Sequence, residues 1–134
     1  MIEVEARAAP DAAAADLAAL AEVLRAVCAR LGVERATVGL LLVGPEEMAR
    51  VNAEHRGKPE PTDVLSFPVD GPDVLDGWPA DGPPPELGDI LICPAAAQEP
   101  LTTLAVHGLL HLLGYDHEVD RGEMLALQDE LIRG

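Results

Sequence analysis

Residues 107–117 read HGLLHLLGYDH and hold three of the four histidines of this 134-residue chain. His107 and His111 are four residues apart, so a helix places them on one face, one turn above the other. Gly114 follows three residues later and can adopt the left-handed conformation that ends a helix and turns the chain back. We expect this turn to bring His117 to the side of the other two imidazoles. Three neutral imidazoles at one point predict a site for one zinc ion, with a fourth position left for water.

The helix that carries His107 and His111 is expected to lie at the centre of the domain, because it is apolar nearly all round. Its apolar positions are Leu101, Leu104, Ala105, Val106, Leu109, Leu110, Leu112 and Leu113. Pro100 suits the first turn of this helix. A buried helix is rigid, which is what a preorganised metal site requires.

The spacing of the three histidines also matches the zinc-binding frame of the metzincin proteases. Those enzymes carry a glutamate directly after the first histidine as the general base, whereas this chain has Gly108 at that position. The metal frame is therefore present without the proteolytic base, and a metallopeptidase would need an acid from elsewhere in the chain. The histidine and cysteine signature of the zinc deaminases does not occur in the sequence.

Three motifs follow one another along the chain: HRGKPEPTDVLSFP (55–68), LGDILIC (87–93) and HGLLHLLGYDH (107–117). Together they resemble the YbeY family of bacterial metal-dependent endoribonucleases and ribosomal RNA maturation factors. With the connecting elements, the resemblance covers nearly the whole chain. It implies a zinc-dependent, single-strand-specific endoribonuclease that acts in maturation of the 3′ end of 16S ribosomal RNA and in ribosome biogenesis. Its partner would be single-stranded or ribosomal RNA, and not DNA.

The resemblance also implies that Arg56 is the catalytic residue, because it lies in a motif similar to the family's arginine segment. A bidentate guanidinium is well suited to neutralise the charge that develops on phosphate oxygens. A surface ion pair is the alternative role of this side chain. Arg50 and Lys58 lie close to Arg56 and beside His55, and they could bind substrate phosphate or could form a solvated helix end.

Three acidic residues of the motifs are candidates for supporting roles. Asp116 precedes the third histidine and could hold an imidazole N–H or cap the turn after Gly114. Asp63 and Asp89 could orient a water molecule or a loop, and could equally be ordinary turn and strand-end acids. The metal frame and the resemblance imply hydrolysis or transesterification of RNA phosphodiesters, with water or the 2′-hydroxyl as the attacking group.

The charge of the chain favours a second function. A net charge of −15 repels phosphate backbones at long range, which favours a non-catalytic, zinc-stabilised ribosome assembly factor. An acidic face is suited to a basic partner, so basic ribosomal proteins are alternative partners. Aromatic residues make up only 2% of the chain, so a platform for base stacking is not expected.

The cysteines and the apolar segments indicate the compartment. Cys28 and Cys93 form no CxxC pattern and are expected to be small buried hydrophobes. The N-terminal residues contain no apolar core of the signal-peptide type, and no run approaches the length of a membrane span. These features predict a cytoplasmic protein with no membrane partner, and we expect it to be a monomer.

We expect one α+β domain over residues 1–134, with about four strands in a mixed sheet and four or five helices around the buried metal-ligand helix. The expected strands cover 2–7, 35–43, 62–67 and 87–93, and the expected helices begin at Pro10, Pro45, Pro100 and Asp120. The first helix is expected to run for about twenty residues and to end at Gly32. Residues 71–86, rich in proline and glycine, are expected to form an irregular loop.

The connector before the histidine helix departs from the family pattern. Residues 94–106 alone separate Cys93 from His107, whereas family members usually carry a longer connector with extra helical turns. We expect the metal ligands to be kept. The helix would lose a packing partner and the cleft would lose one wall, which would weaken binding of the substrate.

Overall fold

Four strands and five α-helices make up the described part of the chain, which is residues 1–10, 12, 15–75, 77–115 and 122–133 of a computed structural model. In chain order they are β1 (Ile2–Ala8), α1 (Leu17–Arg30), β2 (Ala36–Leu42), α2 (Pro45–Arg56), β3 (Val64–Pro68), α3 (Gly71–Val74), β4 (Glu86–Ile92), α4 (Leu101–Leu112) and α5 (Glu123–Arg133). A short 3₁₀ helix, Pro94–Ala96, follows β4.

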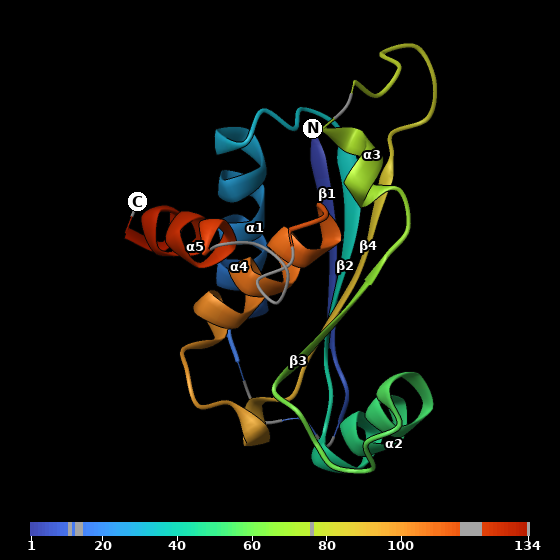
Figure 1. Cartoon of the computed structure of the whole chain (residues 1–134), viewed down its shortest axis with the longest axis vertical. Helices are drawn as coiled ribbons and strands as arrows, with labels where there is room; N and C mark the ends of the chain where they lie inside the picture. The colour runs from blue at the N-terminus through green and yellow to red at the C-terminus, as the bar shows by residue number, and fades with distance from the viewer. Residues whose placement is uncertain (11, 13–14, 76, 116–121, 134) are drawn as a thin grey trace.

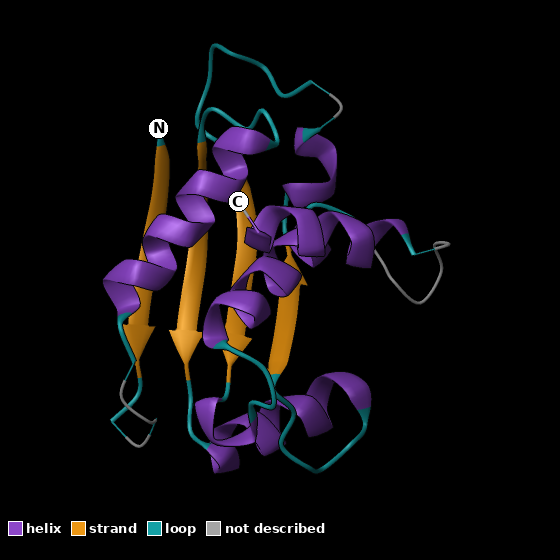
Figure 2. Ribbon diagram, turned by 90° about the vertical axis from the view of Figure 1, so that its left-hand side faces the viewer, coloured by secondary structure: helices purple, strands orange, loops and turns teal. Residues whose placement is uncertain are grey.

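The strands form one mixed sheet in the order β1-β2-β4-β3. Strand β2 is parallel to both of its neighbours, and β3 runs antiparallel to β4 at one edge. Figure 1 shows the sheet nearly edge-on, with α1, α4 and α5 together on one side and α2 at its lower end. Figure 2 shows α1 and α4 lying across the strands. The predicted fold class, an α+β domain with a four-stranded mixed sheet, is confirmed.

Strand β2 lies at the centre of the sheet and is covered on both faces. Leu40 and Leu42 belong to the main core, which β2 shares with α1 and α4. Leu41 points to the other face and packs against a smaller cluster that includes Met48 of α2 and Leu65 of β3. The apolar run at 40–43 therefore has the two-sided cover expected of an interior strand.

Helix α1 begins later than the sequence predicted. The Asp16 side chain accepts a hydrogen bond of 3.0 Å from the backbone N–H of Ala19, so Asp16 is the N-cap. The prediction of a start at Pro10 was wrong, because a capping carboxylate satisfies one of the unpaired N–H groups of the first turn and proline offers no such acceptor. The end was predicted correctly, since Gly32 adopts a φ of +81° just after the helix.

Helix α4 is the buried helix that the sequence predicted. Leu109, Leu110 and Leu112 have no exposed surface, and α4 packs against α1, α5, β3 and β4. The short connector 94–106 therefore does not leave this helix without packing partners. Although α4 is apolar, neither it nor any other helix within the described ranges has the length and hydropathy needed to cross a membrane.

Residues 71–86 were predicted to be an irregular loop, but they begin with the short helix α3. Gly71 opens this helix where no side chain fits, because a Cβ there would lie 1.9 Å from the carbonyl oxygen of Leu112 and 3.0 Å from that of Leu87. Pro72 follows and suits the first turn. The loop prediction was wrong for these residues, because the contact of α3 with the end of α4 is long-range and composition does not reveal it.

Gly71→Ala is expected to destabilise the protein by about 1–3 kcal/mol, because backbone atoms rather than a flexible side chain must move to admit the methyl group. The midpoint of thermal unfolding, followed by circular dichroism, should fall by several degrees. Gly82→Ala is the matched control, since its φ is not positive and no atom lies within 4 Å of the added Cβ. Equal melting temperatures for the two variants would contradict the close packing of α3 on α4.

Both cysteines are buried, as predicted. Cys28 lies in α1 and belongs to the main core, while Cys93 follows β4 and belongs to the smaller cluster. Burial raises the pKa of the Cys28 thiol to about 11, so this side chain remains a protonated, unreactive thiol near neutral pH.

Candidate active site

A cleft of about 650 Å³ lies between α4, strand β3 and the end of α2. It brings together four of the residues predicted to form the site: Arg56, Asp63, His107 and His111. The other lining residues are Thr62, Val64, Leu65, Ser66, Pro68, Pro72, Gly114 and Tyr115. The fold thus joins the arginine motif and the histidine motif, which are distant in the sequence, at one place.

The two histidines of α4 point their Nε2 atoms toward each other, 3.1 Å apart, and both side chains are half-buried. Two nitrogens bound to one tetrahedral zinc ion lie about 3.3 Å from each other, so the His107–His111 spacing fits two ligands of one ion. Among the residues that the structure describes, no group of three His, Cys, Asp or Glu side chains could hold a metal. His117, the predicted third ligand, and Asp116 lie outside the described residues, so the complete ligand set stays a prediction.

The end of α4 turns at Gly114, as predicted. The Gly114 N–H donates to the carbonyl oxygen of His111 at 3.1 Å, and the Tyr115 N–H donates to that of Leu110 at 3.0 Å. These two bonds form a Schellman motif, in which Gly114 adopts a φ of +98°. The chain therefore reverses beside the cleft, and Tyr115 becomes part of its wall.

The second ring nitrogen of His107 has a partner that the sequence did not reveal. Nδ1 of His107 lies 2.8 Å from Oε1 of Gln128 on α5. The sequence feature that could have indicated this role is the helical spacing of Gln128, which lies one turn from the apolar residues Met124 and Leu131 and so shares their face. Such a position usually indicates a buried hydrogen-bond partner.

Arg56 is the last residue of α2, and Gly57 ends that helix with a φ of +70°. The Arg56 side chain is exposed and lines the cleft. None of the ion pairs formed by the described residues involves Arg56. The alternative role, a surface ion pair, is therefore not formed within this part of the chain, and the guanidinium faces the cleft without a carboxylate partner there.

The other two cations of the predicted basic patch do not line the cleft. Arg50 forms ion pairs with Glu47 at 2.5 Å and with Glu54 at 2.8 Å on the surface of α2. The hydrogen bond from Arg50 holds the pKa of the Glu47 carboxyl below its ordinary value. Lys58 is exposed and is not part of the cleft wall. Of these three cations, Arg56 is the one that lines the cleft.

Asn52 supports the segment that follows Arg56. Its side chain is 2% exposed, and its Nδ2 donates to the carbonyl oxygen of Glu60 at 2.9 Å. This bond ties the loop after α2 back to the helix one turn before Arg56. The cleft wall formed by Thr62 and Asp63 is therefore anchored to the same helix that presents the arginine.

The two acidic candidates within the described residues have different locations. Asp63 lines the cleft, and its Oδ1 accepts a hydrogen bond of 2.8 Å from the backbone N–H of Val64. Asp89 is exposed on the other face of the sheet, where its carboxylate lies against Gly39. Asp63 is therefore at the site, whereas Asp89 does not line it.

Gly108 faces the sheet rather than the cleft. A Cβ at this position would lie 2.6 Å from Cγ2 of Ile90 and 3.2 Å from Oγ of Ser66. The Ser66 hydroxyl donates to the Gly108 carbonyl oxygen at 3.1 Å across the same close approach. A glutamate here would point into the core. The position that carries the general base in metzincins cannot serve that purpose in this fold.

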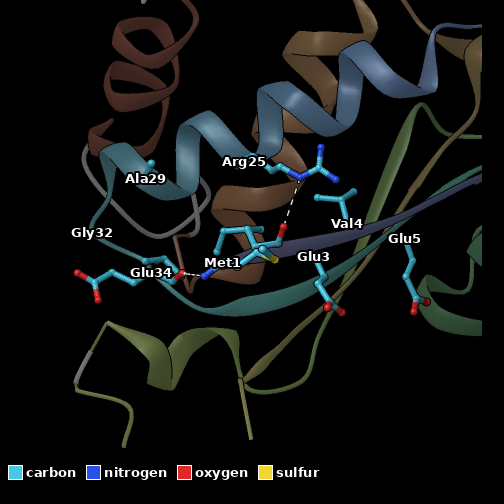
Figure 3. A pocket seen from close by; sticks show the side chains of 10 residues that line it. Met1, Glu3, Val4, Glu5, Arg25, Ala29, Gly32 and Glu34 are labelled. Carbon is cyan, nitrogen blue, oxygen red and sulfur yellow. Dashed lines mark hydrogen bonds between the residues drawn. The ribbon is translucent and has the colours of Figure 1, made fainter. Parts of the chain in front are cut away.

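A larger hollow of about 890 Å³ lies at the free edge of β1, next to the end of α1 (Figure 3). Its walls include Glu3, Glu5 and Glu34, and the Arg25 side chain donates to the carbonyl oxygen of Ile2 at 3.3 Å. No histidine or cysteine lines it. Arg56, Asp63, His107 and His111 of the predicted site thus line the cleft beside α4 and not this hollow.

The fold and the cleft define a class of small α+β proteins, in which a buried helix presents two histidines and a second helix supplies an arginine to the same cleft. Within this class the chain belongs to the endoribonuclease YbeY family. The model of that family matches residues 4–134, which is nearly the whole chain. The resemblance seen in the three motifs is confirmed.

Relatives from several bacteria carry the name endoribonuclease YbeY. The protein of Acidothermus cellulolyticus is 45% identical, in an alignment that covers 72% of this chain and 69% of that protein. The protein of Micrococcus luteus is 40% identical, in an alignment that covers 85% of this chain and 80% of that protein. A solution structure of a Thermotoga maritima protein matches with a TM-score of 0.58 and 26% identity, and covers 99% of this chain and 87% of that one.

Proposed function

We propose that the chain is a zinc-dependent endoribonuclease that cuts single-stranded RNA and acts in maturation of the 3′ end of 16S ribosomal RNA. One observation carries the proposal: Arg56 and the His107–His111 pair line one cleft in a member of the endoribonuclease YbeY family. The names of the relatives support RNA cleavage, and the spacing of the two Nε2 atoms supports zinc. The proposal includes a monomeric enzyme in the cytoplasm.

The residues of the cleft have distinct roles in this reaction. His107, His111 and His117 would hold the zinc ion. When bound, zinc supplies a Lewis acid for a phosphoryl oxygen and increases the acidity of a water molecule. The Arg56 guanidinium binds the non-bridging phosphate oxygens and neutralises the charge that develops on them in the transition state. The half-buried setting of His107 and His111 strengthens the electrostatic interactions of an ion held there relative to bulk water.

The charge of the protein favours a single strand over a duplex. The net charge is −15, and Arg50 is paired with glutamates, so few cations offset the repulsion of phosphates. A duplex carries about one phosphate charge per 1.7 Å of axis, roughly twice the linear density of one strand. The repulsion is therefore weaker for a single strand, whose phosphate can reach Arg56 in the cleft.

The proposal is tested by measuring the zinc content of the purified protein and its cleavage of labelled RNA. We expect about one zinc ion per chain, cleavage of a single-stranded segment of precursor 16S RNA, and resistance of the same segment in a duplex. Chelation should abolish cleavage, and added zinc should restore it. A protein that holds zinc but cuts neither the single-stranded segment nor the duplex would be the non-catalytic assembly factor instead.

A further inference from the structure

We infer that Gln128 is a positioning residue that fixes the tautomer of His107, so that the Nε2 lone pair of His107 faces His111 and the cleft. Nδ1 of His107 lies 2.8 Å from Oε1 of Gln128. An amide oxygen only accepts, so the ring must donate its Nδ1–H. In a neutral imidazole the other nitrogen then carries no proton, so its lone pair can act as a metal ligand.

The place of Gln128 in α5 explains why a polar residue is found there. Met124 is fully buried and Leu131 is 8% exposed, and both lie one turn away from Gln128 on the same face of the helix. Gln128 itself is half-buried in this apolar row. An amide in such a place is costly unless it is hydrogen-bonded. His107 of the neighbouring helix α4 supplies this hydrogen bond.

Helix α5 is held in place independently of the cleft. Met124 belongs to the main core, and Arg30 of α1 donates to the carbonyl oxygen of Leu131 at 3.3 Å. Helix α5 also packs against α4, beside which it lies in Figure 1. The Gln128 amide is thus presented by a packed helix and not by a mobile loop. Rigid support of this kind keeps a ligand ring within the narrow range of orientations that a metal accepts.

Because His107 is a zinc ligand only under the proposed function, this inference rests on that function. A hydrogen-bond acceptor on the far nitrogen of a ligating histidine fixes both its tautomer and its orientation. Loss of such an acceptor typically lowers metal affinity by about 10–100-fold. Gln128 therefore acts on zinc through His107 and does not itself touch the ion.

The experiment compares the wild type with Gln128→Leu, which removes the acceptor at similar size, and with Gln128→Glu, which keeps an acceptor. Gln98→Leu is the matched control, because Gln98 is exposed and does not line the cleft. Imidazole ¹⁵N NMR of the metal-free proteins at about pH 8, where an ordinary histidine is neutral, gives the tautomer of His107. Competition with a chromophoric chelator gives the affinity for zinc alone.

We expect His107 to be protonated at Nδ1 in the wild type and in Gln128→Glu, and to show mixed tautomers in Gln128→Leu. Zinc affinity should fall about 10–100-fold in Gln128→Leu, stay within a few-fold in Gln128→Glu, and not change in Gln98→Leu. A wild-type ring protonated at Nε2 would overturn the inference, even if Gln128→Leu failed to fold. So would equal tautomers and affinities in Gln128→Leu and the wild type.

The NMR measurement needs neither zinc nor RNA, so failures of the two proposals are distinguishable. A protein with the expected tautomer and no RNA cleavage would contradict the proposed function alone. A protein that cuts RNA with zinc but has the other tautomer would contradict the role of Gln128 alone.

Discussion

His111→Ala is expected to remove the bound zinc and to reduce RNA cleavage to background. The substitution deletes one of two imidazole nitrogens that lie 3.1 Å apart, and an ion that loses one of three protein ligands is bound much more weakly. Zinc content and cleavage should fall together, because the proposed reaction requires the ion. Elemental analysis of the purified variant and a gel assay with labelled single-stranded RNA measure the two effects.

His55→Ala is the matched control for this experiment. His55 is exposed on α2, and its ring packs against Phe67 with centroids 4.5 Å apart. It does not line the cleft. We therefore expect His55→Ala to retain both zinc and cleavage. If His111→Ala retained a full complement of zinc, the assignment of His107 and His111 as ligands would have to be abandoned.

Arg56→Ala is expected to lower kcat/KM for RNA cleavage by about a hundredfold or more, with zinc content unchanged. The guanidinium lies in the cleft wall without an ion pair among the described residues, so its charge is available to a substrate phosphate. Its removal leaves the developing negative charge of the transition state without this donor. Initial rates over a range of RNA concentrations separate the loss in kcat from that in KM.

Two further variants show whether the loss is specific to this guanidinium. Arg56→Lys keeps the charge without the bidentate geometry, so we expect it to recover only part of the rate. Arg50→Ala removes a cation from the same helix that is engaged by Glu47 and Glu54 outside the cleft, and should leave the rate nearly unchanged. A similar loss in Arg50→Ala and Arg56→Ala would mean that general charge, and not a placed arginine, governs the reaction.

Local sequence patterns predicted those parts of the fold whose physical cause is local. The buried helix α4 follows from an unbroken set of apolar positions, and its end follows from Gly114, because glycine tolerates the positive φ that the turn requires. The same local patterns predicted the ends of the four strands to within about two residues. Local reasoning missed the start of α1, which is set by the side-chain cap of Asp16. It also missed the helix α3, whose first residue must be glycine because the carbonyl oxygen of Leu112 in α4 lies too close for a Cβ.

The sequence by itself therefore determined the order and kind of most elements, the spacing of His107 and His111, and the family. Tertiary structure alone decided that Arg56 shares their cleft, that Gln128 bonds to His107, and that the strands lie in the order β1-β2-β4-β3. The reason is the range of the interactions. The periodic patterns that indicate helices and strands involve residues close together in the sequence. Contacts between distant segments depend instead on how whole elements pack their apolar faces against one another.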